Sequence, residues 1–106
     1  MKTFNWKDFI GGWFVGDFMP TIFLTKDVEV CIKRYSAGDC DNRHYHLIAD
    51  EITMIVEGTV KMNGIEYKKN DIILIEKSEI TDFSAITDAI TCVIKIPSVK
   101  GDKYLL

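Results

Sequence analysis

The sequence has no cluster of basic residues and no apolar run long enough to span a membrane. Its 13 Lys and Arg residues are scattered along the chain and outnumbered by 16 Asp and Glu residues, giving a formal charge of −3. Such a chain offers no positive field to a phosphate backbone, and a membrane helix needs about 20 consecutive apolar residues. We therefore expect neither nucleic acid nor a membrane among its partners.

Cysteine pairs are also lacking. Cys31, Cys40 and Cys92 form no CxxC motif and are odd in number, which argues against a disulfide framework or a zinc ribbon. The apolar residues near the N-terminus are interrupted by Lys7 and Asp8, so this segment lacks the unbroken core of a signal peptide. We expect reduced thiols and a cytoplasmic protein.

The chain shows no internal repeat, low-complexity tract or linker. With 106 residues, 47% of them hydrophobic and 27% charged, its composition is that of an ordinary globular protein. The sequence predicts a single domain over residues 1–106.

Helical spacing is confined to the N-terminal segment. Large apolar residues recur at helical intervals from Trp6 to Trp13, with Asn5 as a candidate cap, and Gly11 and Gly12 end any helix there. At most one short helix is predicted. Its aromatic stripe is expected to serve the core or a dimer contact rather than a cofactor site.

From residue 21 onward the pattern is typical of β-strands. Short runs rich in Val, Ile, Thr, Tyr and Phe alternate with polar turns. The fold class predicted is all-β. The expected strands cover residues 21–24, 28–35, 43–47, 51–57, 59–62, 65–68, 72–75, 80–85 and 90–96.

Asn63-Gly64 is the clearest local signal, because this dipeptide suits a two-residue type I′ turn in which both residues need positive φ. The turn predicts a hairpin in which Lys61 faces Glu66, a pair of opposite charge. The full predicted register pairs Met62 with Ile65, Lys61 with Glu66 and Val60 with Tyr67.

The run Ile72-Ile73-Leu74-Ile75 is apolar at every position. Unbroken apolar runs are typical of strands that are covered on both faces. We expect barrel or sandwich packing to supply that cover.

The two histidines of the chain, His44 and His46, lie two residues apart in a β-like segment. Residues two apart in a strand project from the same face, so both imidazoles can reach one ion. Glu51 opens the next apolar strand and adds a carboxylate. Two imidazoles and one carboxylate form a set that binds iron(II), manganese or zinc with open positions.

The spacing around these residues is distinctive. Gly38 is followed after five residues by His44, then after one residue by His46, after four by Glu51 and after six by Gly58. This stretch resembles the first motif of the cupin family throughout.

The resemblance implies a cupin-type double-stranded β-helix, a jelly-roll barrel, with a core over about residues 21–97. It also implies that His44, His46 and Glu51 hold a divalent metal (Mn, Fe or Zn) inside the barrel.

The second cupin motif is not matched. Its Gly, Pro, Gly, His and Asn places hold Asn70, Glu76, Ser78, Thr81 and Ala85. The strand pattern is kept while the fourth metal ligand is lost, so we expect the metal to be weakly held or absent. Thr81 is a poor ligand but belongs to the pocket, and Asp82 becomes a further candidate ligand if a bulge shifts its strand.

Strand alternation extends the expected pocket. If Glu51 faces inward, Thr53 and Ile55 do the same. The pocket would then combine a hydroxyl with aliphatic walls, which suits a small, partly apolar molecule. We find no Gly-rich phosphate loop that would indicate a nucleotide.

Three functions stay open. The resemblance is compatible with a small cupin barrel that binds a divalent metal, a small organic ligand or both, with a metal-dependent enzyme (dioxygenase, isomerase or lyase), and with a metal-free ligand-binding or regulatory module. A homodimer is expected because small barrels leave strand edges that a second chain can cover.

Overall fold

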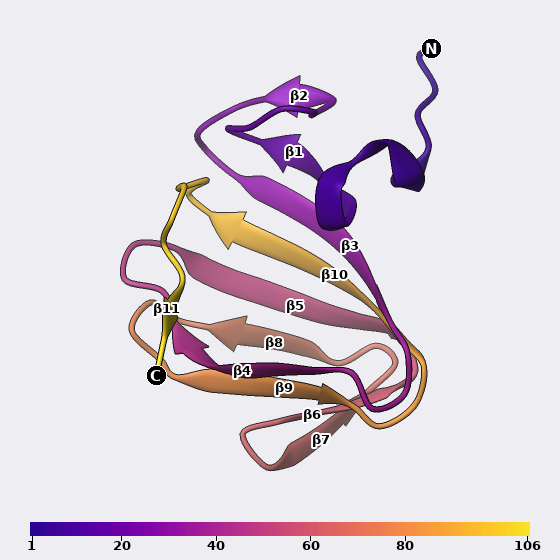
Figure 1. The fold of residues 1–106 in the computed structure, drawn as a ribbon, viewed down its shortest axis with the longest axis vertical. Coiled ribbons are helices and arrows are strands. Elements are labelled where there is room, and N and C mark those ends of the chain that lie inside the picture. Colours follow the sequence, from indigo (N-terminus) through magenta and orange to yellow (C-terminus); the bar gives the residue numbers. More distant parts are fainter.

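The computed structural model describes all 106 residues and consists of two facing β-sheets (Figure 1). One sheet has the strand order β2-β1-β3-β10-β5-β8, and the other has the order β11-β4-β9-β6-β7. The predicted all-β jelly roll is confirmed. The strands are β1 (Trp13–Gly16), β2 (Phe23–Leu24), β3 (Glu29–Tyr35), β4 (Cys40–Tyr45), β5 (Asp50–Glu57), β6 (Thr59–Met62), β7 (Ile65–Lys68), β8 (Ile72–Ile75), β9 (Thr81–Ala85), β10 (Ala89–Ile96) and β11 (Tyr104–Leu105).

Two strands were not predicted, and both lie outside the expected core of residues 21–97. β1 pairs with β2 and β3, although its first residue had been assigned to the end of a helical stripe. β11 pairs with β4. Two residues are too few to show an alternation in sequence, so β11 could be found only from the tertiary fold.

The N-terminal helix reduces to two 3₁₀ turns, η1 (Trp6–Asp8) and η2 (Ile10–Gly12). Asn5 caps the first turn as predicted, because its side chain accepts a hydrogen bond from the backbone N–H of Lys7 (3.0 Å). The segment packs on β3 of its own chain, where the indole Nε1 of Trp6 donates to the carbonyl of Ile32 (2.7 Å). No helix in the structure has the length and apolar character that a membrane crossing requires.

The predicted β6–β7 hairpin is confirmed in its turn and its register. Asn63 and Gly64 have φ angles of 50° and 81°, and Lys61 is paired with Glu66. The inner residues of the hairpin, Val60 and Met62, are buried in the hydrophobic core. The core cluster consists of Ile55, Val60, Met62, Ile75, Phe83, Ala85 and Ala89.

The expectation that β8 is covered on both faces is wrong for the single chain. Ile75 is buried in the core cluster, whereas Ile72 and Leu74 are 65% and 57% exposed. β8 is the last strand of its sheet, and the outer face of the sheet carries no second layer at this point (Figure 1).

Two glycines with nearly equal φ angles offer a matched test of the fold. Gly64 (φ 81°) has open space where a Cβ would stand, whereas a Cβ on Gly58 (φ 85°) would overlap the carbonyl oxygen of Asp88. We expect Gly64→Ala to lower the free energy of unfolding by about 1–2 kcal/mol for the left-handed backbone alone. Gly58→Ala should lower the free energy of unfolding by roughly 1–3 kcal/mol more than Gly64→Ala does, because the new Cβ overpacks its surroundings. Urea denaturation measures both, and equal losses would contradict this packing at Gly58.

Candidate functional site

A cavity of about 60 Å³ lies between the two sheets, beyond the hydrophobic core. Side chains of both sheets line it, and most of them are polar. The lining residues are Trp13, Lys33, Tyr35, Asp41, His44, His46, Glu51, Thr53, Met62, Thr81, Phe83, Thr91, Val93, Lys95 and Lys103.

A bulge in β4 determines which of its residues reach the cavity. Asp41 is paired with Phe83 and His44 with Thr81, so three steps along β4 match two along β9. The extra residue lets Asp41 and His44 face inward together, which regular alternation forbids.

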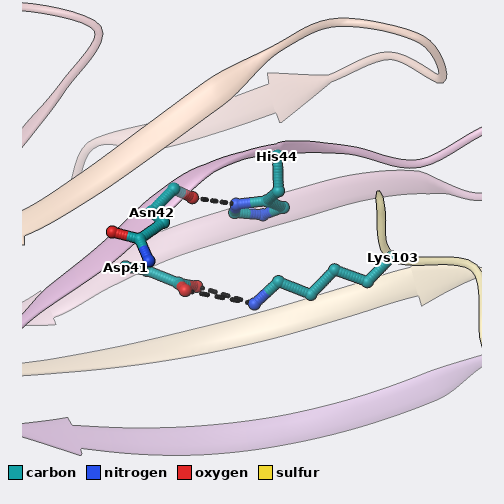
Figure 2. Close-up of polar contacts among 4 residues, drawn as sticks. All are labelled: Asp41, Asn42, His44 and Lys103. Carbon is teal, nitrogen blue, oxygen red and sulfur yellow. Dashed lines mark hydrogen bonds and ion pairs between the residues drawn. The ribbon is translucent and has the colours of Figure 1, made fainter. Parts of the chain in front are cut away.

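His44 is held by its own strand. It is 7% exposed, and its Nδ1 lies 2.7 Å from the backbone carbonyl oxygen of Asn42 (Figure 2). Because a carbonyl oxygen only accepts hydrogen bonds, Nδ1 carries a proton in this contact, and Nε2 is the ring nitrogen left for a ligand.

His46 is buried, with 5% of its surface exposed. Its Nε2 atom has no hydrogen-bond partner in the chain, and its ring stands nearly perpendicular to that of His44 with centroids 5.4 Å apart. Burial, followed by the positive charge of Lys95, lowers the pKa of His46 to about 4. His46 is therefore neutral at neutral pH and leaves one nitrogen free for a ligand.

The inward face of β5 changes from polar to apolar along the strand. Glu51 and Thr53 line the cavity, and the hydroxyl of Thr53 donates to Glu51 Oε2 (3.2 Å). Ile55 does not line it, contrary to expectation. It faces the same side but belongs to the core cluster and is fully buried, because the core fills this end of the barrel.

Of the two candidates on β9, only Thr81 lines the cavity. Asp82 faces the other way, and its Oδ1 accepts a hydrogen bond from the backbone N–H of Asn63 (2.7 Å) in the hairpin turn. The expected role of Asp82 as a ligand is therefore wrong. The bulge lies on β4 rather than on β9, so alternation on β9 keeps Asp82 outside.

Three lysines of the site were missed because the sequence analysis treated lysines as scattered surface residues. Lys33 and Lys95 share the inward face of their sheet with Thr91 and Val93, and their ammonium groups lie 5.8 and 5.3 Å from the centre of the Trp13 ring. Strand alternation within residues 89–96 could have identified Lys95 as a cavity residue, since it places Lys95 on the same face of the strand as Thr91. Lys103 arrives from the C-terminal segment and had no such signal.

The predicted metal centre is not formed by the side chains as they stand. His44, His46 and Glu51 line one cavity as expected, but no group of three or more His, Cys, Asp or Glu residues is arranged to hold a metal ion. The cavity wall also carries three ammonium groups, and their positive charges repel a metal cation. The residues present do not fit a three-ligand metal site.

No family model matches the sequence, and no curated protein matches it either. Solved structures do match in fold. One is an uncharacterized conserved protein with a double-stranded β-helix domain from Klebsiella pneumoniae subsp. pneumoniae MGH 78578 (TM-score 0.69, 19% identity, 76% of this chain and 71% of that chain). Another is a cupin protein from Bacteroides fragilis (TM-score 0.62, 23% identity, 76% and 74%).

A third match is a sugar phosphate isomerase from a cupin superfamily, from Silicibacter pomeroyi DSS-3 (TM-score 0.64, 23% identity, 71% of this chain and 53% of that chain). At these identities the likeness shows the fold alone. The resemblance to cupins predicted from the first motif is confirmed at that level.

The lowered pKa of His46 predicts a specific pH dependence of stability. Between pH 6.5 and about 4 the unfolded chain binds a proton at this residue and the folded chain does not, so the free energy of unfolding falls as the pH falls through that window. The loss attributable to His46 should reach roughly 3 kcal/mol at pH 4, and it should be absent in His46→Gln.

Urea denaturation of both proteins at pH 7.5 and pH 4.5 measures this effect. Subtracting the pH-dependent change in the free energy of unfolding of one protein from that of the other cancels the contribution of the carboxylates. These include Glu29, whose pKa is raised by burial. Parallel pH profiles would show that His46 is not buried in its neutral form.

Proposed function

We propose that this chain, which has the double-stranded β-helix fold of the cupins, binds a small organic acid in the cavity between its sheets. The observation that carries the proposal is the charge of the cavity wall. Three ammonium groups line it together with two carboxylates and a neutral His46.

Two of these ammonium groups are unpaired. Neither Lys33 nor Lys95 has a carboxylate oxygen within 4.0 Å, since the ion pairs of the chain are Lys69–Glu57 and Lys103–Asp41. Their contact with the Trp13 ring directs both charges toward one place. Lys95 has Glu29 and Glu51 as its cross-strand neighbours, but neither carboxylate forms an ion pair with it, so a ligand carboxylate would supply the close partner through charge-assisted hydrogen bonds.

Size and hydrogen bonding narrow the ligand further. A cavity of about 60 Å³ has room for roughly four to six water-sized positions, which corresponds to an acid of a few carbon atoms. His46 Nε2 is buried without a partner, and a hydroxyl or keto group on the ligand would satisfy it. In this proposal His44, His46 and Glu51 act as hydrogen-bonding groups.

The metal-dependent enzyme considered from the sequence is less well supported, because it relied on three converging ligands. One similar structure is described as a sugar phosphate isomerase, and a phosphate group would be attracted by the same lysines. We assign the cavity to a carboxylate because the cavity is small and its hydroxyl-bearing wall suits a compact ligand.

Calorimetric titration tests the proposal with lactate as the probe and lactamide as its uncharged counterpart. We expect saturable binding of lactate and at least tenfold weaker binding of lactamide. Lys33→Met and Lys95→Met should each weaken lactate about tenfold or more through the lost charge-assisted hydrogen bond. Lys68→Met, at an exposed position on β7, is the matched control and should change nothing.

Equal binding of lactate and lactamide, or no binding of either, would refute the proposal. The metal alternative is tested on the same protein with manganese, iron(II) and zinc. Uptake of about one ion per chain that disappears in His44→Ala and His46→Ala would restore the metal site and overturn the metal-free assignment.

We also propose that a second copy of the chain covers the outer face of β8, β5 and β10. The register places the outward side chains of these strands side by side, and between Asp50, opposite Ile96, and Glu57, opposite Ile90, none of them is charged. They are Ile52, Met54, Val56, Ile72, Leu74, Ile90, Cys92, Ile94 and Ile96. An uncharged apolar face is complementary to itself, and an exposed apolar edge strand such as β8 needs cover.

The extent of this face predicts a weak dimer. About seven residues on each of β5 and β10 and the four of β8, at about 3.3 Å per residue and about 4.8 Å between strands, give roughly 300 Å² per copy, less than the roughly 800 Å² of a stable interface. Sedimentation velocity should show dimers only in the upper micromolar range, and Leu74→Lys should abolish them. Ile65→Lys, at a similarly exposed isoleucine on the hairpin, should leave them intact. A monomer at all concentrations, or association with an added membrane or another protein only, would contradict the self-contact.

A further inference from the structure

The C-terminal segment from Asp102 to Leu105, called the strap below, crosses from the six-stranded sheet to the five-stranded sheet. Figure 1 shows it leaving the end of β10 and descending to β4, where β11 pairs. Lys103 lies in the middle of the strap and lines the cavity. The strap thus adds a charged group to a site that the two sheets otherwise form.

Asp102 anchors one end of the strap. It is 5% exposed, and its carboxylate accepts hydrogen bonds from the consecutive backbone N–H groups of Leu47 (3.1 Å), Ile48 (3.2 Å) and Ala49 (2.9 Å). These residues connect β4 to β5. Three backbone donors on one buried carboxylate fix its position strongly.

β11 anchors the other end. Tyr104 is paired with Tyr45 and Leu105 with His44, and the rings of Tyr45 and Tyr104 stack with centroids 5.3 Å apart. The strap is therefore held against the strand that carries His44 and ends just before His46. Lys103, between the two anchors, has its backbone position determined on both sides.

The side chain of Lys103 is held more weakly than its backbone. Its Nζ contacts both carboxylate oxygens of Asp41 at 3.1 and 3.2 Å, beside His44 (Figure 2). The two side chains are 44% and 39% exposed, and an ion pair with that exposure contributes little to stability. An ammonium group has three donors, so Lys103 can turn toward a ligand without disturbing the anchors.

We propose that Lys103 is a specificity-determining residue that contacts a second carboxylate of the ligand, so that the cavity prefers short dicarboxylic acids. This inference rests on the organic-acid function proposed above. Lys33 and Lys95 reach the cavity from the six-stranded sheet and Lys103 reaches it from the five-stranded side. Cationic groups that approach from opposite sides match an anion at each end of a ligand. Asp102 is a positioning residue that sets the place of Lys103.

Calorimetric titration with malonate and acetate tests the proposal. We expect the unmutated protein to bind malonate at least tenfold more tightly than acetate. Lys103→Met should reduce this ratio about tenfold by weakening malonate while leaving acetate nearly unchanged. Asp102→Asn should reduce the ratio in the same direction although Lys103 is present, and Lys68→Met should not alter it.

The outcomes separate this inference from the function on which it rests. If neither acid binds the unmutated protein, the proposed function fails. If acids bind but malonate is not preferred, or if Lys103→Met keeps the malonate-to-acetate ratio, the role of Lys103 is refuted and the organic-acid function stands. Unfolding midpoints are measured for every variant. Should Asp102→Asn fail to fold, Lys103→Met alone decides, because it removes only an exposed ion pair.

Discussion

The bulge in β4 is the constraint on which the rest of the cavity depends. A regular strand would place either Asp41 or His44 on the inner face, because their separation is odd. The extra residue brings both inside against Phe83 and Thr81. The inward Asp41 then gives Lys103 an ion-pair partner at the cavity, and the strap that carries Lys103 lies along the same strand. One local irregularity thus places an acid, an imidazole and an ammonium group at one site.

The barrel interior is divided between this polar cavity and the hydrophobic core. β5 crosses from one to the other, with Glu51 and Thr53 in the cavity and Ile55 in the core. Such a division suits a small domain, because a few buried apolar residues at one end can support a polar interior at the other. The lysines fit this arrangement since their aliphatic stems can pack along the wall while the charged ends approach the opening. Trp13 provides the surface for two of them.

Features encoded by adjacent residues were the ones that the sequence predicted well. The Asn63-Gly64 turn and its register follow from local φ preferences, and the strand runs follow from alternation and composition. Features that depend on tertiary contacts were missed or misplaced. The bulge in β4, the outward direction of Asp82 and the arrival of Lys103 all depend on which strands become neighbours. Ile55 was predicted to line the pocket because strand alternation shows which face of the sheet a side chain lies on. It does not show how far along the barrel the side chain lies.

The unmatched second motif shows how the double-stranded β-helix fold can persist without the residues of that motif. Asn70 and Ser78 stand in the glycine places of that motif and adopt positive φ angles of 80° and 73°, so the turns persist without glycine. The backbone N–H of Asn70 donates to Ile55 (2.8 Å), and that of Ser78 donates to the carbonyl of His46 (2.6 Å). These bonds hold the strand ends and the His46 backbone through the main chain, which any residue can supply. The histidine place holds Thr81, which is buried, pairs with His44 and lines the cavity. A threonine at this place is therefore compatible with the fold, and the wall beside it carries the three lysines.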